Sequence, residues 1–532
     1  MARNTPEECF LALQTRRKSI DTRLRILEPL DEHCDDMPLT GNITPLGFGG
    51  MIRLTCGIFG LQLVFSALMS SATPYLRSLG LTKQLTAIVL SSGPIAGAIG
   101  QPVVGALSDR CQHPWGRRTP FIVGGTFFCI LSMLSLVWVK ESTHLFAVVL
   151  NLDHSSDVIK TAIVIGASFW VCAVNMAVAP LQAGLRAFII DNCPQQQQVE
   201  ANAWAGRMTG FGNTLGYTLG MLPLPRLLPW LGDTQFKAQF SIASVILSLT
   251  VATCCLTIKE EAPIREKADR RGTSLTAIFW QLCRSVKTLP PVTRQVCKVQ
   301  FFAWMGWFPF LFYITSYIGE LYSRPILARV ASQPDSADLR EALWNRAVRV
   351  GVSGSFLFAL ISVVTSLVAP SFVSPTTRRS SRPRKTTSLP KVSLPRLWML
   401  SHLFFSLSTF LTILARTETW GRVFVGMAGV SWTMTMWAPF ALISAEISGI
   451  ESDRQQMAAG EMDVCPDIKA GVVIGLHNVA IATPQILSAL VASVVLKALQ
   501  AFGVEDTFGW LLRLAGLPAL IAAYLARDMC ER

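Results

Sequence analysis

Long apolar stretches recur along the chain and are separated by shorter segments rich in charge, glycine and proline. A helix that crosses a bilayer needs about 20 consecutive, predominantly apolar residues. The pattern therefore predicts an all-α membrane protein with twelve transmembrane helices. We expect them near residues 52–73, 85–107, 119–139, 160–181, 203–224, 238–258, 298–319, 348–369, 397–414, 421–446, 470–495 and 508–526.

The loops between these stretches predict how the chain is divided. The longest, 259–297, separates six expected spans from six, so we expect two six-helix bundles at 51–258 and 298–526 with a solute site at mid-depth between them. The rest we expect in the cytosol: a disordered tail at 1–50, the central loop, a disordered basic loop rich in Ser, Thr and Pro at 370–396, and a short C-terminus at 527–532.

Charge supports a membrane protein and gives its orientation. Only 15% of the residues are charged and 51% are hydrophobic, whereas soluble domains carry about 25% charged residues. With a cytosolic N-terminus, the inner segments hold roughly 29 Lys and Arg and the outer segments roughly 14, as the positive-inside rule requires. The net charge of +13 therefore indicates basic cytosolic loops rather than nucleic-acid binding.

Several function classes find no support in the sequence. No Walker loop or dinucleotide fingerprint is present, which argues against ATP-driven transport. The 13 cysteines are scattered without the spacing of a zinc site or a disulfide framework. No nucleophile and base stand in an enzymatic arrangement, so we expect neither an enzyme nor a bound cofactor or metal.

Polar side chains interrupt two consecutive apolar segments between residues 175 and 217. Charged and amide side chains at membrane depth are costly and normally face a bundle interior or a water-filled cavity. We therefore expect a bound solute here. The residues concerned are Asn175, Gln182, Arg186, Asp191, Asn202, Arg207 and Asn213. Arg186 and Asp191 could instead simply end a helix on the cytosolic side.

The loop between the second and third expected spans carries a distinctive motif. Gly105 is followed by Asp109 and Arg110, and then by Trp115-Gly-Arg117-Arg118. A carboxylate and guanidinium groups at this place can fasten the cytosolic ends of the two bundles in one state and release them in another. We expect Asp109, Arg110, Arg117 and Arg118 to form such a gating loop. The motif resembles the loop signature of the major facilitator superfamily, lengthened between Arg110 and Gly116.

The lengthened motif and several further segments resemble the sucrose and α-glucoside proton symporters, in the glycoside–pentoside–hexuronide:cation symporter branch of that superfamily. The combination of tail and basic loops looks most like fungal members. The matching segments are 60–81, 93–125, 181–217, 301–322, 437–448 and 470–485. The resemblance implies the major facilitator fold and a secondary active transporter that moves a disaccharide with a proton by alternating access.

Carried over residue by residue, the resemblance assigns roles within the spans. Arg186 corresponds to the arginine that contacts sugar hydroxyls in the family, and its guanidinium suits a polyol because it offers five donors. Asp191, Glu446, His477 and Asn478 also match the family pattern. We expect substrate binding by Asn175, Gln182, Arg186, Asn213, His477 and Asn478, together with aromatic stacking by Trp304, Tyr313 and Trp437.

Two positions depart from the family pattern. The family's proton-carrying aspartate is here Asn175, which cannot titrate, and Phe65 and Leu68 replace a Trp-x-x-Glu pattern in the first span. Glu446 is the best remaining candidate for proton coupling, because burial raises a carboxylate's pKa, and Asp191 is the second. An uncoupled sugar facilitator and a non-transporting sugar sensor stay open as alternatives. A sugar, a proton and the bilayer are the expected partners, and the plasma membrane is the expected location, with a vacuolar or other internal membrane as the alternative.

Overall fold

The computed structural model describes residues 45–81, 83–150, 157–260, 275–330, 337–373, 391–458 and 470–530. Helices make up nearly all of these ranges, and their one β contact is a bridge between Val373 and Val392. Most of the predicted N-terminal tail and of the basic loop 370–396 lies outside the described residues, as do residues 261–274 of the central loop.

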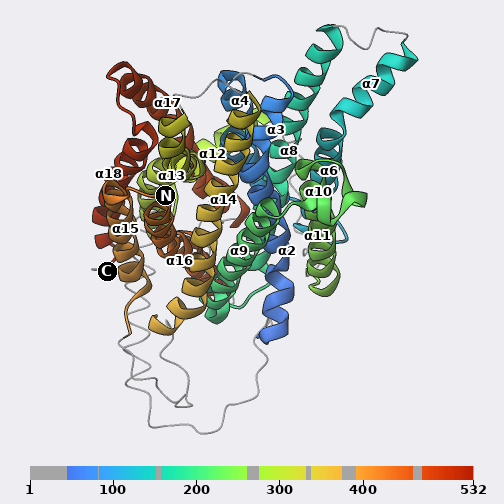
Figure 1. Ribbon diagram of the computed structural model, residues 1–532. Helices are drawn as coiled ribbons and strands as arrows, with labels where there is room; N and C mark the ends of the chain where they lie inside the picture. Colours follow the sequence, from blue (N-terminus) through green and yellow to red (C-terminus); the bar gives the residue numbers. More distant parts are fainter. Residues whose placement is uncertain are drawn as a thin grey trace.

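The N-terminal bundle contains the first six predicted spans (Figure 1). Its spanning helices are α2 (Phe48–Ala67), which continues through the π-helical turn η1 (Leu68–Ala72) into α3 (Thr73–Ser78); α4 (Lys83–Leu90) with α5 (Ser92–Ser108); α6 (Thr119–Val137); α8 (Asp157–Asp191); α9 (Gln198–Met221); and α11 (Gln235–Thr257). Shorter pieces are α7 (Val139–Val149), η2 (Gln195–Gln197), α10 (Leu224–Leu227) and η3 (Pro229–Leu231).

The C-terminal bundle contains the other six. Its helices are α13 (Pro291–Val330), α14 (Ala337–Val368) with η4 (Ala369–Phe372), α15 (Leu394–Leu411) with η5 (Thr412–Leu414), α16 (Glu418–Ala458), α17 (Ala470–Ala501) and α18 (Thr507–Arg527). Every predicted span therefore coincides with a helix. The sequence pattern missed α7, which projects beyond the bundle beside the outer end of α8 (Figure 1), and α12 (Leu275–Lys287) in the central loop.

Each bundle has its own apolar core. One cluster of buried side chains comes from α2 to α11, between Met51 and Cys254. The second comes almost entirely from α13 to α18. Between the bundles, α5 packs against α17, and α9 packs against both α14 and α16. Two sets of helices, each with most of an apolar core of its own, therefore meet along a seam.

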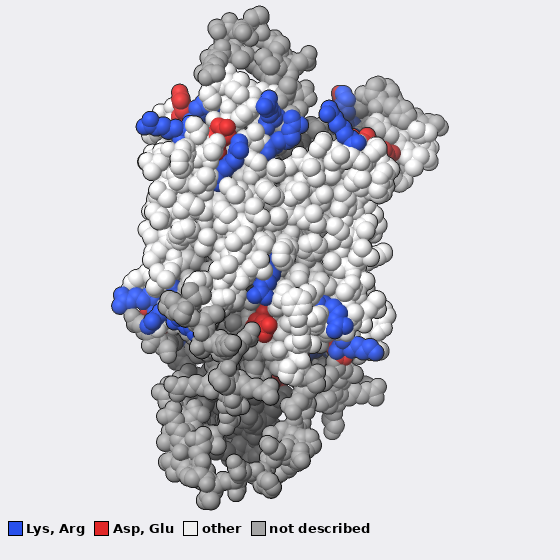
Figure 2. Space-filling model, turned by 60° about the horizontal axis from the view of Figure 1, so that its bottom comes forward, with Lys and Arg blue, Asp and Glu red and all other residues white. Residues whose placement is uncertain are grey.

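The surface has the charge distribution of a membrane protein. Figure 2 shows a wide belt without charged side chains between two bands that carry Lys, Arg, Asp and Glu. Ten described helices are long and apolar enough to cross a membrane. The other two predicted spans are α9 and α16, which are long enough but carry more polar residues. Their polar side chains, such as Asn202 and Thr435, are buried at the seam or in the bundle interior. These helices are therefore less hydrophobic on the sides that do not face lipid.

Candidate functional site

A cavity of about 240 Å³ lies between the two bundles. Helices α2, α5, α8 and α9 form one wall, and α13, α14, α16 and α17 form the other. The chemistry of the two walls differs. The polar side chains of the N-terminal wall are Gln62, Ser66, Gln101, Asn175, Gln182, Arg186, Asn213 and Tyr217, whereas the C-terminal wall presents Trp304, Phe308, Phe312, Phe358, Trp432 and Phe440 with the amides Asn478 and Gln485.

The amides of the N-terminal wall are held in place by hydrogen bonds. Gln62 Nε2 donates to Asn213 Oδ1 at 2.9 Å, which joins α2 to α9. Asn175 Nδ2 donates to Ser92 Oγ at 2.9 Å and to the Val171 carbonyl at 3.1 Å. These contacts occupy N–H groups of Gln62 and Asn175 and one acceptor site of Asn213 Oδ1, and each amide oxygen keeps acceptor capacity because it has two lone pairs. The wall is therefore preorganised for a ligand rich in hydroxyl groups.

The aromatic wall is a connected cluster of rings. The Trp304 and Trp432 rings meet edge to face with centroids 5.8 Å apart. Their indole N–H groups are buried and have no hydrogen-bond partner among the described residues. Apolar rings with an unused N–H suit a sugar ring, which offers a C–H face and hydroxyls at its edge. Across the seam, Asn478 Nδ2 donates to the Gly97 carbonyl at 2.7 Å.

Arg186 occupies an unusual position in this cavity. Its side chain belongs to α8 and is only 9% exposed, and its guanidinium lies 3.8 Å from the centre of the Phe440 ring on α16. Its Nη1 has no hydrogen-bond partner among the described residues. The edge of His477 meets the same phenyl ring at a centroid distance of 5.0 Å. The cation is thus held against an aromatic ring of the opposite bundle, with donors free for a ligand.

The structure places most of the predicted binding residues in the cavity. Its lining includes Asn175, Gln182, Arg186, Asn213, Trp304 and Asn478. The other three do not line it. Tyr313 stacks on Phe508 of α18, Trp437 donates its indole N–H to the Val199 carbonyl at 3.1 Å, and His477 makes a T-shaped contact with Phe440 and has both ring nitrogens unpartnered among the described residues.

Sequence reasoning missed several lining residues. Gln62, Gln101 and Phe440 all line the cavity but were not among the predicted site residues. Gln62 and Gln101 are uncharged polar residues within apolar spans, a signal that the rule on polar residues at membrane depth could have used. Phe440 carries no such signal, because an apolar ring in a membrane helix looks like any other packing residue.

The two carboxylates proposed for proton coupling lie outside the cavity lining, toward its cytosolic side. Asp191 ends α8 and contacts Arg117 and Arg118. Glu446 accepts hydrogen bonds from the backbone N–H groups of Val292 and Thr293 at 2.9 and 2.7 Å, and from the Thr293 hydroxyl at 2.7 Å. Its carboxylate thus caps the first turn of α13 and ties α16 to that helix, where a negative charge is favourable.

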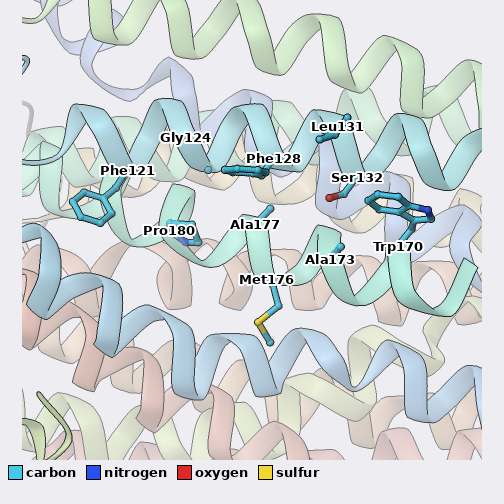
Figure 3. Close-up of a pocket in the computed structure, with 11 residues that line it drawn as sticks. Phe121, Gly124, Phe128, Leu131, Ser132, Trp170, Ala173, Met176, Ala177 and Pro180 are labelled. Carbon is cyan, nitrogen blue, oxygen red and sulfur yellow. The ribbon is translucent and has the colours of Figure 1, made fainter. Parts of the chain in front are cut away.

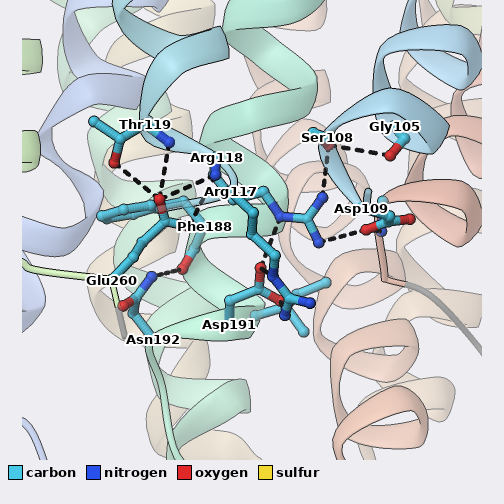
Figure 4. Close-up of polar contacts among 12 residues, drawn as sticks. Gly105, Ser108, Asp109, Arg117, Arg118, Thr119, Phe188, Asp191, Asn192 and Glu260 are labelled. Atoms are coloured by element: carbon cyan, nitrogen blue, oxygen red, sulfur yellow. Dashed lines mark hydrogen bonds and ion pairs between the residues drawn. The ribbon is translucent and has the colours of Figure 1, made fainter. Parts of the chain in front are cut away.

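The predicted gating loop forms a buried charge network (Figure 4). The Arg118 guanidinium lies 2.6 Å from Asp109 and 2.7 Å from Asp191 and donates to Ser108 Oγ at 2.6 Å, with no exposed side-chain surface. Burial alone lowers the pKa of Arg118, but Asp191 and Asp109 more than offset this and raise it. Arg117 pairs with Asp191 at 3.1 Å from a 44% exposed position, and Arg110 is exposed.

This network, which we call the latch (Asp109, Arg118, Asp191 and Glu260), joins several elements. Asp109 accepts from the N–H groups of Gly471 and Val472 at 3.1 and 2.9 Å, so the end of α5 caps the start of α17 in the other bundle. Glu260 accepts from the N–H groups of Arg118 and Thr119 and so caps α6. Gly116, with φ +104°, leaves room for Glu260, since a Cβ there would lie 2.1 Å from its Oε2.

Further hydrogen bonds join the bundles near the same end. Asn202 Nδ2 donates to Ser444 Oγ at 3.1 Å, which connects α9 to α16. Arg207 Nε donates to the Ser366 carbonyl at 3.3 Å, which connects α9 to α14. Together with the latch they close the end that the charge pattern assigns to the cytosol. The structure therefore represents a state that is closed on that side.

A second hollow, of about 610 Å³, lies on the outer face of α6 and α8 (Figure 3). Apart from Ser132 and the Trp170 indole N–H, its lining is apolar. The residues are Phe121, Gly124, Gly125, Phe128, Leu131, Ser132, Trp170, Ala173, Met176, Ala177 and Pro180. Phe128, Leu131 and Met176 are exposed at the apolar belt. Such a surface suits lipid chains and offers a hydrophilic solute few partners.

Comparison with known proteins gives consistent matches. The Major Facilitator Superfamily profile matches residues 54–489. The "General alpha-glucoside permease" of Schizosaccharomyces pombe is 32% identical and covers 90% of this chain and 93% of its own length. The "Sucrose transport protein SUT5" of Oryza sativa is 28% identical, covering 90% and 89%.

Solved structures show the same fold. The "proton:xylose symporter XylE bound to 6-bromo-6-deoxy-D-glucose" superposes with a TM-score of 0.57 at 13% identity, covering 90% of this chain and 95% of the other. The outward conformation of the transporter FucP superposes with a TM-score of 0.52 at 14% identity, covering 89% and 98%.

Proposed function

The chain belongs to the major facilitator superfamily, and from that premise we propose that it carries an α-glucoside, such as sucrose or maltose, across a membrane by alternating access. It is a multi-pass membrane protein and not an enzyme. An α-glucoside permease and a sucrose transport protein are among the proteins it is similar to. We propose the plasma membrane as its location, by analogy with these relatives.

The cavity is the observation that best supports this proposal. Amides and one arginine on the N-terminal wall can bind several hydroxyl groups, and the rings of the C-terminal wall can take the C–H face of a sugar. Because each bundle supplies one wall, a ligand that touches both stabilises the bundles in a closed arrangement. That coupling between binding and rocking of the bundles is what transport by alternating access requires. A cavity with one wall from each bundle also favours a transporter over a sensor.

We further propose that transport is coupled to a proton and that Glu446 carries it. None of the described residues that line the cavity is acidic, so the carrier we propose lies outside its lining. Glu446 connects α16 to the first turn of α13. A neutral carboxyl would cap that turn more weakly than a carboxylate, so protonation would loosen a contact at the cytosolic end of the C-terminal bundle.

The proposal is tested by uptake of labelled sucrose and maltose in a yeast strain without disaccharide carriers and external hydrolase. Uptake would be measured at pH 5 and pH 7, with and without a protonophore. We expect accumulation above the external concentration that the protonophore abolishes, and a loss of pH dependence in Glu446→Gln. No uptake of either sugar, with the protein shown at the cell surface, would contradict the transport proposal.

An uncoupled facilitator is the second candidate, and Asn175 is the observation that favours it. The amide at this position is hydrogen-bonded to Ser92 and Val171, and it cannot carry the coupled proton because it does not titrate. A facilitator would equilibrate the sugar without accumulating it and would ignore the protonophore. The same uptake experiment therefore distinguishes the two candidates. Unchanged pH dependence in Glu446→Gln would remove this residue as the carrier in either case.

A further inference from the structure

The cavity contains a positive charge without a matching negative one. Arg186 is 9% exposed and faces the cavity, and its Nη1 has no hydrogen-bond partner among the described residues. None of the described residues that line the cavity is Asp or Glu. A buried cation without a counter-charge is strongly unfavourable. A ligand that brings the missing negative charge would relieve this cost.

Nearby carboxylates are already engaged elsewhere. Asp191, five residues after Arg186 on α8, pairs with Arg117 and Arg118 in the latch. Glu446 caps the first turn of α13. Neither contacts the Arg186 guanidinium in the described structure. The charge is therefore not compensated by the acidic groups that flank the cavity.

The contact that Arg186 does make is a weak substitute for an ion pair. Its guanidinium stacks on the face of Phe440 at 3.8 Å. A cation–π contact stabilises the charge, but a phenyl ring has no acceptor for the N–H groups in the guanidinium plane. A carboxylate fits those donors because the fork of the guanidinium can bind both of its oxygens.

We propose that the cavity prefers an anionic α-glucoside, whose carboxylate binds Arg186 while the glucosyl unit lies between the amide wall and the aromatic wall. This inference rests on the proposed function, because it names the substrate class of the same cavity. Gln182 lies one helical turn before Arg186 and also faces the cavity, so it marks the wall beside the bound carboxylate.

The test uses two disaccharide derivatives of matched shape. Maltobionate and maltitol both keep the α-glucosyl unit and an open-chain second unit, and they differ at one carbon, which is a carboxylate in the first and a hydroxymethyl group in the second. Binding to the purified full-length protein in detergent would be measured by thermal shift and by calorimetry at pH 6. We expect maltobionate to bind about tenfold more tightly, since hydrogen bonds to charged groups contribute roughly that factor.

Variants connect the preference to Arg186. Gln182→Glu places a carboxylate one turn before Arg186, in the favourable order for an ion pair on a helix. We expect this variant to bind maltobionate and maltitol about equally, or to bind maltitol more tightly, because the new carboxylate neutralises the charge of Arg186. The neutral variant Gln182→Met should retain the preference for maltobionate. Arg186→Gln should lose it, and Arg186→Lys should keep part of it.

Several results would overturn the inference. One is equal or tighter binding of maltitol by the wild-type protein, another is an unchanged preference in Arg186→Gln, and a third is equally tight binding of gluconate alone, which would mean that the carboxylate need not belong to a glycoside. Uptake of maltose without tighter maltobionate binding would overturn the inference and leave the proposed function intact. Tighter maltobionate binding without uptake of any glycoside would support the preference for an anionic ligand and contradict the proposed transport function.

Discussion

Two buried arginines, Arg118 in the latch and Arg186 in the cavity, lie in opposite electrostatic surroundings. Arg118 is fully buried between two carboxylates and a hydroxyl group. Arg186 is nearly as deeply buried, yet it rests on a phenyl ring and has an unused Nη1. A buried charge that is fully paired holds a structure together, whereas one that is left unpaired is available to a ligand. The contrast separates the gate from the binding site.

The largest effect should follow from removing the paired charge. Arg118→Gln removes the cation that Asp109 and Asp191 share and leaves both carboxylates buried. Breaking a buried ion pair in this way lowers the free energy of unfolding by about 3–5 kcal/mol. We expect a loss of stability of that size in an SDS unfolding titration of the full-length protein. The matched control is Arg117→Gln, because Arg117 is 44% exposed and its pair with Asp191 contributes at most about 1 kcal/mol. Equal effects of the two variants would contradict this reading of the latch.

The unpaired charge should behave in the opposite way. Arg186→Gln should lower sugar uptake about 100-fold, since about two charge-assisted hydrogen bonds to the substrate are lost. The same variant should unfold no more easily than the wild type, because an uncompensated buried cation has been removed. Uptake normalised to surface protein and the SDS titration measure the two quantities. A marked loss of stability would show that Arg186 is paired in the folded protein after all.

A smaller effect is expected where the latch touches the opposite bundle. A Cβ on Gly471 would lie 2.5 Å from the Gly105 carbonyl oxygen and 2.7 Å from Asp109 Oδ1. Gly471→Ala should therefore force α5 and α17 apart, at a cost of about 1–3 kcal/mol to the closed state. The distance between spin labels at Arg110 and Glu451, both exposed, should increase.

Gly124→Ala is the matched control for that experiment, because nothing lies within 4 Å of a Cβ at Gly124. It should leave the distance distribution unchanged. A Gly471→Ala protein with the distribution of the wild type would mean that the Asp109 contact to α17 does not hold the bundles closed.

The smallest effect should come from a neutral contact between the bundles. Asn202→Ala removes the hydrogen bond to Ser444 Oγ, which contributes about 0.5–1.5 kcal/mol. The same pair of spin labels should report a small increase in the open population. Ser444→Ala should act equally, and the double variant should add little, because both remove one interaction. Additive effects would show that the two side chains act separately.

The charge pattern and the composition of the sequence predicted more of the latch than of the cavity. Asp109, Arg117 and Arg118 stand within ten residues in one loop, so their proximity follows from the chain itself. Glu260 also caps α6 but lies 141 residues after Thr119 in the chain, so its proximity could not be predicted in that way. The cavity draws its lining residues from helices of both bundles that are far apart in the chain. Apart from Trp304, each predicted cavity residue was found because it is polar at membrane depth or matches the family pattern.

The aromatic residues show why the sequence alone does not predict which side chains line the cavity. Trp304, Tyr313 and Trp437 were expected to contact a sugar, yet Trp304 lines the cavity while Tyr313 faces α18 and Trp437 faces α9. An aromatic ring in an apolar helix carries no mark of the side to which it points. Its direction depends on the rotation of the helix against its neighbours, which is set by packing of the whole bundle.

The sequence by itself determined the twelve spans, their grouping into two bundles and the charged loop between the second and third spans, because bilayer thickness and charge act on short contiguous stretches. Tertiary structure alone decided that Arg186 lies on Phe440 without a counter-charge, that Glu446 caps α13 and that Asp109 caps α17. Each of these contacts joins helices that are far apart in the chain. The first and third exist only because the two bundles meet in one particular arrangement, and the second because α13 and α16 pack together within the C-terminal bundle.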